Sequence, residues 1–434
     1  MILFKSFRNI FAIEELRNKI LFTLGVLVIT RLGRLIPVIG VDTALLGRMI
    51  QESKGVGGLL SYLDLFSGGA LSQGTLFALG ISPYITASIM MQLLGMTIPR
   101  FEQLLKEGDY GRKIMNQYTR YLTLVLSIVY SSSYALVLEA KGLVLDPGIG
   151  FKLIFIVSLA AGAMFVMWLG DQISLYGIGN GSSVIICSSI VARFPSDIGR
   201  TLTFIKEGQV DPFIAILALI IFILIAACII FLEKGERKIS VQYARRIIGQ
   251  RMYAGQSTYL PFKINPTGVM PVIFASSFLN FPRLVFGMLA EYFKQLRFLA
   301  DFISQPFVMN IMLFVLIVFF SFAYTALIFN PEELADNMKK NGGFIPGIRP
   351  GRKTAEFFDY ILTRIGLVGA IYLGCLAVLP DLFTAYMGLP IALGGTSILI
   401  AVGVALDVSA QMETYLIEHR YEGFLDTGRL RARG

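Results

Sequence analysis

Long apolar segments recur along the chain, separated by shorter polar segments. Each is close to the ~20 residues that a helix needs to cross the hydrocarbon core of a bilayer. The pattern predicts ten membrane spans, at residues 20–38, 75–98, 119–138, 151–170, 181–194, 212–232, 267–290, 307–329, 360–380 and 389–410. The fifth is short, and three glycines at 177, 179 and 181 lead into it, so it is expected to be broken or tilted. The predicted fold class is an all-α polytopic membrane protein.

Two of the predicted spans share a sequence pattern. The second contains GISPYITAS at 80–88 and the seventh GVMPVIFAS at 268–276, which agree at five of nine positions. Gly80 with Pro83, and Gly268 with Pro271, predict a weakened, bent helix that can act as a hinge. Spans five apart run in opposite directions, as an inverted repeat of two five-helix halves (1–195 and 196–434) predicts. The alternative is that Gly, Ala, Ser and Pro are simply common in membrane helices.

Composition agrees with the pattern. Of the 434 residues, 55% are hydrophobic and only 15% are charged, a balance that excludes an ordinary soluble globular protein. Lys and Arg number 25 in the segments on the side that holds the N-terminus and 8 in the opposite loops. Because cytoplasmic loops carry the excess of basic residues, both termini are expected in the cytoplasm.

Two cytoplasmic loops, 233–266 and 330–359, and the C-terminal tail 411–434 carry much of this basic charge. Within the loops, Arg245, Arg246, Arg251 and Arg349 are candidates for docking a cytosolic partner or anionic RNA. The alternative is ordinary positive-inside topology. Asn330-Pro331 and Gly342-Gly343 predict a helix between them, and the glycines and proline around Arg349 predict a turn that presents its side chain.

Catalytic and metal-binding chemistry is scarce. The chain has one histidine, in the C-terminal tail, and three isolated cysteines, which exclude a His/Cys metal cluster. The spans offer no pair of acids at helical spacing near a midplane, and no phosphate-binding loop is in register. We therefore expect no enzyme, no cofactor and no energy source within the chain.

The spans do offer isoleucines at one-turn spacing. Ile81 and Ile85 share a face of the second span, Ile186 and Ile190 repeat that spacing in the short fifth span, and Ile273 matches Ile85 in the repeat. The alternative is ordinary helix packing. A narrow ring of isoleucines would gate by dewetting, and it is chemically indifferent to what passes through it.

Taken together, the segments resemble the SecY family, the channel subunits of the Sec protein-translocation complex. The likeness spans essentially the whole chain. It is carried by FSGGALSQGTLFALGISPYITASIMMQLL (66–94), EGDYGRKIMNQYTRY (107–121), MWLGDQISLYGIGNGSSVII (167–186), YAGQSTYLPFKINPTGVMPVIFASS (253–277), YTALIFNPEELADNMKKNGGFIPGIRPG (324–351) and GGTSILIAVGVALD (394–407).

The resemblance implies a ten-helix hourglass that opens sideways to lipid between helices 2 and 7. It implies a plug at 60–73 that seals the resting pore, including Leu65, Phe66, Ser67, Gly68 and Gly69. It maps the pore ring onto Ile81, Ile85, Ile186, Ile190, Ile273 and Ala405. At the last position related channels commonly carry a larger aliphatic residue, so Val404 or the plug is expected to help close that side.

The resemblance also implies partners and place. These are the small subunits SecE and SecG, the SecA motor ATPase, the ribosome with a possible ribosomal RNA contact, signal peptides, unfolded secretory polypeptides and membrane lipid. The expected location is the bacterial cytoplasmic membrane. A secondary transporter on an inverted repeat is the alternative, but it would need polar or ionisable ligands at the midplane, where this chain has isoleucine.

Overall fold

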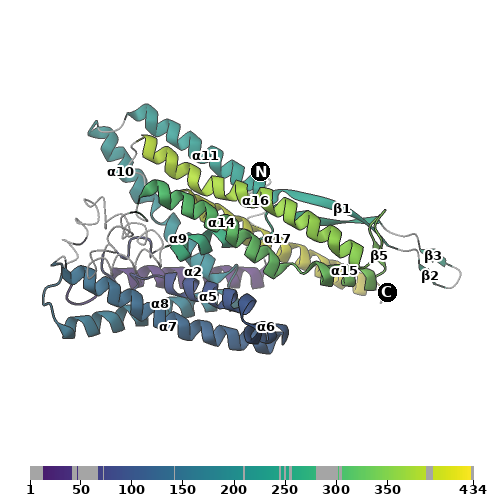
Figure 1. The fold of residues 1–434 in the computed structure, drawn as a ribbon, viewed down its shortest axis with the longest axis horizontal. Coiled ribbons are helices and arrows are strands. Elements are labelled where there is room, and N and C mark those ends of the chain that lie inside the picture. Colours follow the sequence, from purple (N-terminus) through teal and green to yellow (C-terminus); the bar gives the residue numbers. More distant parts are fainter. Residues whose placement is uncertain are drawn as a thin grey trace. The chain divides into compact units, whose positions relative to one another are not determined.

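The computed structural model is mostly helical, as predicted (Figure 1). It describes residues 13–41, 46, 67–71, 73–140, 142–208, 211–243, 246–248, 251–253, 257–279, 302, 305–387 and 394–431. The helices and short strands are α2 (Glu14–Leu32), η1 (Gly33–Leu35), α5 (Ser82–Thr97), α6 (Pro99–Lys106), α7 (Asp109–Ala140), α8 (Ile149–Tyr176), α9 (Gly181–Val191), α10 (Phe194–Lys206), α11 (Pro212–Lys234), β1 (Glu236–Tyr243), β2 (Arg246–Ile248), β3 (Arg251–Tyr253), β4 (Ser257–Lys263), α14 (Pro306–Ile328), α15 (Pro331–Lys340), β5 (Gly343–Phe344), α16 (Arg352–Met387) and α17 (Gly395–Arg431).

Each predicted span contains a described helix. Six of the helices are long and apolar enough to cross a membrane, and a shorter apolar helix, Met270–Leu279, lies in the seventh predicted span. The prediction of ten spans in two inverted halves goes beyond this finding and stays a prediction.

The chain divides into two compact units. The first comprises Met1–Thr203, Ser277–Val308 and Ile400–Gly434, and the second Phe204–Ser276 and Met309–Leu399. The first unit thus includes most of α17, although that helix lies at the far end of the sequence. The boundary at residue 195 expected from the sequence repeat concerns pseudo-symmetry, and it too stays a prediction.

The first unit is built on close helix packing. The α7 and α8 helices meet through buried aromatic side chains, with the ring centroids of Tyr134 and Phe155 5.5 Å apart. Gly162 of α8 lies against the carbonyl of Leu76, so closely that a Cβ at this position would overlap the backbone. Inside a membrane, where lipid is as apolar as leucine, helices associate through such van der Waals contact at small residues.

The second unit contains the two long basic loops, and here the all-α prediction is incomplete. Strands β4, β1 and β5 form an antiparallel sheet in that order, with Glu236 opposite Lys263 and Gln242 opposite Phe344. One face of β1 buries Ile239 and Val241 against Met338 of α15 and Phe358 of α16. The described parts of loops 233–266 and 330–359 therefore fold together. We call strands β4, β1 and β5 with helix α15 the β-platform.

Local chain signals explain where several helices begin. Asn330 accepts hydrogen bonds from the backbone amides of Glu332 and Glu333 at 3.2 and 3.5 Å, which caps α15, and Gly342 follows its end with a φ of 73°. This confirms the helix predicted between Asn330 and Gly342. Asp211 caps α11 in the same way, accepting from Phe213 N at 3.0 Å.

Candidate functional site

The start of α5 corrects the sequence interpretation of the second span. Residues 76–81 form successive turns, and the helix begins only at Ser82. Gly80 therefore precedes the helix, with a φ of 54°, and Pro83 lies in its first turn. A proline there removes no helical hydrogen bond and favours the helical φ, so it starts the helix instead of bending it. The predicted bend within a continuous helix is wrong.

The matching stretch of the second unit has the same local geometry. Gly268 has a φ of 59°, and the apolar helix begins two residues later at Met270, with Pro271 in its first turn. The amide of Ile85 donates to Ile81 O, and the amide of Ile273 donates to Val269 O, both at 3.2 Å. The sequence likeness of 80–88 and 268–276 thus corresponds to one repeated local structure.

The turn at Gly268 is held by a polar network at the end of α11. The Asn265 Nδ2 donates to Gly268 O at 2.9 Å and to Glu233 Oε1 at 2.8 Å, and Thr267 Oγ1 donates to Asn265 Oδ1 at 2.9 Å. Asn265 and Thr267 are both buried. Buried polar groups that are satisfied in this way rigidify the backbone they hold, so the network fixes where the helix with Ile273 begins.

The isoleucines at the predicted ring positions are all buried. Ile81, Ile85, Ile186, Ile190 and Ile273 are each at most 4% exposed. On α8, the position of a Gly170 Cβ would lie 3.3 Å from Ile81 Cδ1 and 3.7 Å from Ser182 N. The missing side chain of Gly170 therefore leaves room for Ile81, and the missing side chain of Gly181, whose Cβ would overlap Gly170 O, lets the start of α9 approach α8.

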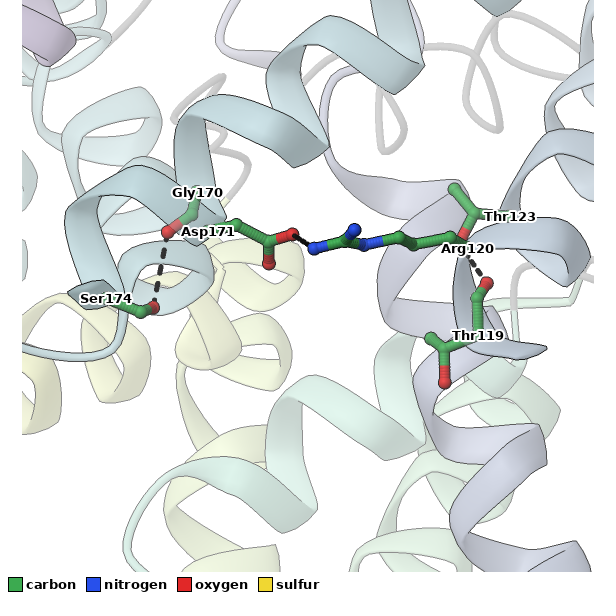
Figure 2. Close-up of polar contacts among 6 residues, drawn as sticks. All are labelled: Thr119, Arg120, Thr123, Gly170, Asp171 and Ser174. Atoms are coloured by element: carbon green, nitrogen blue, oxygen red, sulfur yellow. Dashed lines mark hydrogen bonds and ion pairs between the residues drawn. The ribbon is translucent and has the colours of Figure 1, made fainter. Parts of the chain in front are cut away.

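Polar contacts fix the height of α9. The Asn180 side chain caps its first turn, and the amide of Gly181 donates to Ser174 Oγ at 2.9 Å. Ser174 in turn donates to Gly170 O at 3.2 Å (Figure 2). Because α9 has only 11 residues, this attachment decides the level at which Ile186 and Ile190 lie. The short fifth span is an intact helix, so the predicted glycine break lies before it, at 177–180.

The remaining ring position differs from the isoleucines. Ala405 of α17 is exposed, whereas its neighbour Val404 is buried. In the same helix Ala401 O lies 3.8 Å from the Cys187 sulfur of α9. Helix α17 thus packs on α9 within the first unit and carries Ala405 with it.

An ion pair joins the neighbouring helices α7 and α8. Arg120 Nη2 of α7 lies 2.8 Å from Asp171 Oδ2 of α8, and within the same part of α7 Thr123 Oγ1 donates to Thr119 O at 2.7 Å (Figure 2). The Asp171 side chain is 25% exposed and that of Arg120 53%. A pair this accessible to solvent is worth at most ~1 kcal/mol, so it orients α8 beside α7 more than it stabilises the unit.

Part of the predicted plug is described. Leu65 and Phe66 lie outside the described residues, but Ser67–Leu71 are placed, and Ser67 is buried. Gly68 and Gly69 both adopt positive φ, 61° and 96°. Such backbone favours glycine, so the two glycines form a sharp turn at this end of the predicted plug.

The predicted docking arginines lie in the second unit. Arg246 and Arg251 belong to the β2–β3 hairpin, where Arg246 faces Tyr253 and Ile248 faces Arg251 across the ladder; Arg245 lies outside the described residues. In Figure 1 the hairpin lies beyond the end of β1. Arg349 is exposed in a turn bounded by Gly347 and Gly351, and Thr354 Oγ1 donates to its carbonyl at 3.0 Å. This confirms the predicted turn.

Comparison with known proteins decides the family. The SecY family model matches residues 75–409, which include both glycine turns, α9, the β-platform and Ala405. The protein translocase subunit SecY of Escherichia coli (strain K12) is 41% identical over 431 residues, covering 97% of this chain and 96% of that protein. That of Mycobacterium bovis is 43% identical over 435 residues, covering 95% and 97%. The chain belongs to the SecY family.

Solved structures agree on the fold. A structure described as that of a protein conducting channel matches with a TM-score of 0.65 at 19% identity, covering 92% of each chain. The Sec61 chain of a canine ribosome-channel complex from the endoplasmic reticulum matches with a TM-score of 0.62 at 18% identity, again covering 92% of each. The SecY-family fold is therefore kept where most of the sequence has changed.

Sequence reasoning missed several residues that position the SecY-family elements. Asn265 and Glu233 hydrogen-bond across 32 residues of sequence, and Ser174 bonds the first amide of the next helix, contacts that the apolar pattern of the spans does not reveal. The weak signal that was present is compositional: polar residues stand directly before Gly268 and Gly181, where helices begin.

The paired glycine turns generate a prediction. Gly80→Ala and Gly268→Ala each place a Cβ on left-handed backbone, which costs ~1–2 kcal/mol. Thermal unfolding of each purified variant in detergent should therefore have a lower midpoint than the wild type. Gly25→Ala in α2 and Gly366→Ala in α16 are matched controls, because both glycines are helical and no described atom lies within 4 Å of the added Cβ. Equal midpoints for all four variants would contradict the positive φ at Gly80 and Gly268.

Proposed function

We propose that the chain is the protein-conducting channel subunit of a protein translocase. It passes unfolded secretory polypeptides across the membrane and releases apolar segments sideways into lipid. The observation that carries the proposal is identity of 41% to a protein translocase subunit over nearly the full length of both chains. The long apolar helices support it, since they provide the spans that a membrane channel needs.

The pore constriction is formed by Ile81, Ile85, Ile186, Ile190, Ile273 and Ala405. Support comes from the repeated turn, which starts the helices of Ile85 and Ile273 in the same way, and from the attachment of α9 to α8. A constriction of isoleucine side chains loses its water when narrow, and ions that would have to shed their hydration then stop. Aliphatic side chains also make no specific bonds, which suits a substrate of varied sequence.

Opening involves a plug and a lateral gate. The plug is residues 60–73, and the gate lies between the second and seventh spans. In each span a glycine, Gly80 or Gly268, precedes the helix, and a proline, Pro83 or Pro271, lies in its first turn. The glycines support a hinge role because glycine adopts backbone conformations closed to other residues; at Gly268 the turn changes only when the hydrogen bond from Asn265 to its carbonyl breaks. A signal peptide that enters between the two spans would displace the plug.

The energy that moves the polypeptide through the channel comes from a partner protein. The β2–β3 hairpin with Arg245, Arg246 and Arg251, and the turn with Arg349, form the docking surface for a cytosolic partner, either the SecA motor ATPase or the ribosome. Support comes from the basic charge of both segments, from the exposure of Arg349, and from the β-platform from which they extend. A matched chain of known structure is part of a ribosome-channel complex. SecE and SecG are the proposed small subunits, the location is the bacterial cytoplasmic membrane, and both termini are cytoplasmic.

The alternative of a secondary transporter is not favoured. The relatives of this chain are translocase subunits. The motif shared by 80–88 and 268–276 places isoleucine where a transporter would need polar ligands. The same relatives are named protein translocase subunits, and we propose no catalytic activity for this chain.

Passage of a polypeptide can be tested by disulfide crosslinking. In a variant whose three native cysteines are replaced by serine, Ile85→Cys and Ile273→Cys should each crosslink to a cysteine-bearing secretory precursor stalled in transit. Removing Cys187 matters, because it lies on α9 between Ile186 and Ile190. Leu219→Cys, on the 61% exposed side chain of a residue in α11, is the control that should not crosslink. Equal crosslinking at all three positions, or none at 85 and 273, would count against the proposed path.

Charge reversal tests the docking surface. Arg349→Glu should slow motor-driven translocation by about tenfold, the effect of ~1.4 kcal/mol of lost binding, while leaving the protein inserted in the membrane. The measurement is precursor import into vesicles containing equal amounts of channel. Lys353→Glu is a nearby control on an exposed cation that already pairs with Glu356 at 2.7 Å. Unchanged import for Arg349→Glu would exclude this turn as the docking site.

A further inference from the structure

Two arginines lie at the end of the first predicted span. Arg31 is in the last turn of α2, and Arg34 is in the short helix η1 that follows it. A guanidinium is costly at membrane depth unless polar groups of the protein receive it. Where these two side chains go is therefore informative about function.

Arg31 reaches the short helix α9. Its Nη2 donates to the backbone carbonyl of Ser188 and contacts Ser188 Oγ at 3.2 Å. The same carbonyl accepts the helical hydrogen bond of Ala192 N at 3.1 Å. Ser188 lies between Ile186 and Ile190, so Arg31 ties the first span to the backbone of the proposed constriction.

Arg34 reaches the plug end that the structure describes. Its Nη2 occupies the space where Gly68 would carry a Cβ, and its Cζ is 2.8 Å from that position. Ser189 O of α9 lies 2.7 Å from the same position. Gly68 is thus enclosed between the Arg34 guanidinium and the α9 backbone, a fit that no residue with a side chain allows.

The same end of the plug is held by further contacts. Leu71 N donates to Ser67 Oγ at 3.2 Å, and Tyr134 Oη of α7 donates to Leu71 O at 2.8 Å. A cavity of about 20 Å³ lies where α2, η1, the described plug end and α9 meet. Its lining includes Thr30, Arg34, Ser67 and Ser189. That volume is about what one water needs, and the lining offers it polar partners.

We infer that Arg34 is a positioning residue that holds plug residues 67–71 against α9 in the resting channel, beside the hydrogen bond by which Arg31 joins α2 to the same helix. This inference rests on the proposed function. The Arg34 Nη2 is buried without a hydrogen-bond partner among the described residues, so it holds the plug by packing against Gly68. A contact of this kind restrains the resting state yet is broken by a small displacement, because van der Waals contact is lost within about 1 Å.

The first experiment measures resting ion conductance of the purified channel complex in planar bilayers. Arg34→Ala should raise it severalfold over the wild type, with Arg34→Gln as a second variant in case the alanine variant folds poorly. Arg364→Ala is the control, because this span arginine instead lies over the Tyr360 ring at 4.2 Å. Wild-type conductance in both Arg34 variants would overturn the inference.

The two plug glycines give a sharper test. Gly68→Ala and Gly69→Ala meet similar backbone strain, but only the first places a methyl group against Arg34 and Ser189, since no described atom lies within 4 Å of the second. Gly68→Ala should raise conductance more than Gly69→Ala. Combining Gly68→Ala with Arg34→Ala should add little further, because both break one contact. Equal effects of the two glycine variants, or full additivity, would contradict the contact.

A structural readout separates this inference from the proposed function. Hydrogen exchange of the segment 67–71 should become faster in Arg34→Ala and stay unchanged in Arg364→Ala, whether or not the protein transports anything. Unchanged exchange would overturn the positioning role. Precursor import by the wild-type complex is measured in parallel. If the wild type imports nothing while Arg34→Ala shows faster exchange, the proposed function is rejected and the Arg34 contact stands.

Discussion

A glycine in left-handed backbone, placed two residues before a helix begins, is the constraint on which the account depends. It occurs at Gly80 in the first unit and at Gly268 in the second, each followed by a proline in the first helical turn. The turn sets the residue at which each helix starts, and through it the level of Ile85 and Ile273. Only backbone buried in protein or lining a cavity tolerates such turns within a membrane segment.

The helices around the first of these turns are joined by contacts that depend on small or polar residues. Gly170 leaves room for Ile81, and Gly181 lets α9 approach α8. Ser174 accepts a hydrogen bond from the first amide of α9, and Arg31 donates to the α9 carbonyl of Ser188. These contacts share one consequence: they fix the short helix that carries Ile186 and Ile190. The apolar side chains proposed to seal the channel are held in place by backbone and polar groups around them.

Much of this was accessible from sequence. Each apolar run predicted as a span contains a helix in the structure. The five residues shared by 80–88 and 268–276 marked one repeated local structure. The glycine and proline were misinterpreted as a bend, because sequence shows a weak point in a helix but not whether it lies inside the helix or before it. The β-platform was missed because β1 alternates over few residues and its partner β5 lies about 100 residues away. Arg31 and Arg34 were visible as charges in a span, but their partners on α9 and at Gly68 depend on tertiary structure.

The most direct test of the central claim is the resting conductance of a channel whose isoleucine constriction has been made polar. Ile85→Asn together with Ile273→Asn should let water remain in the constriction, so that resting ion conductance in a planar bilayer rises well above that of the wild type. Ile229→Asn is the matched control, since it buries the same polar group in the core of α11, where the wild-type side chain is 0% exposed. A double variant that folds and remains as tightly closed as the wild type would contradict the claim that these isoleucines seal the channel.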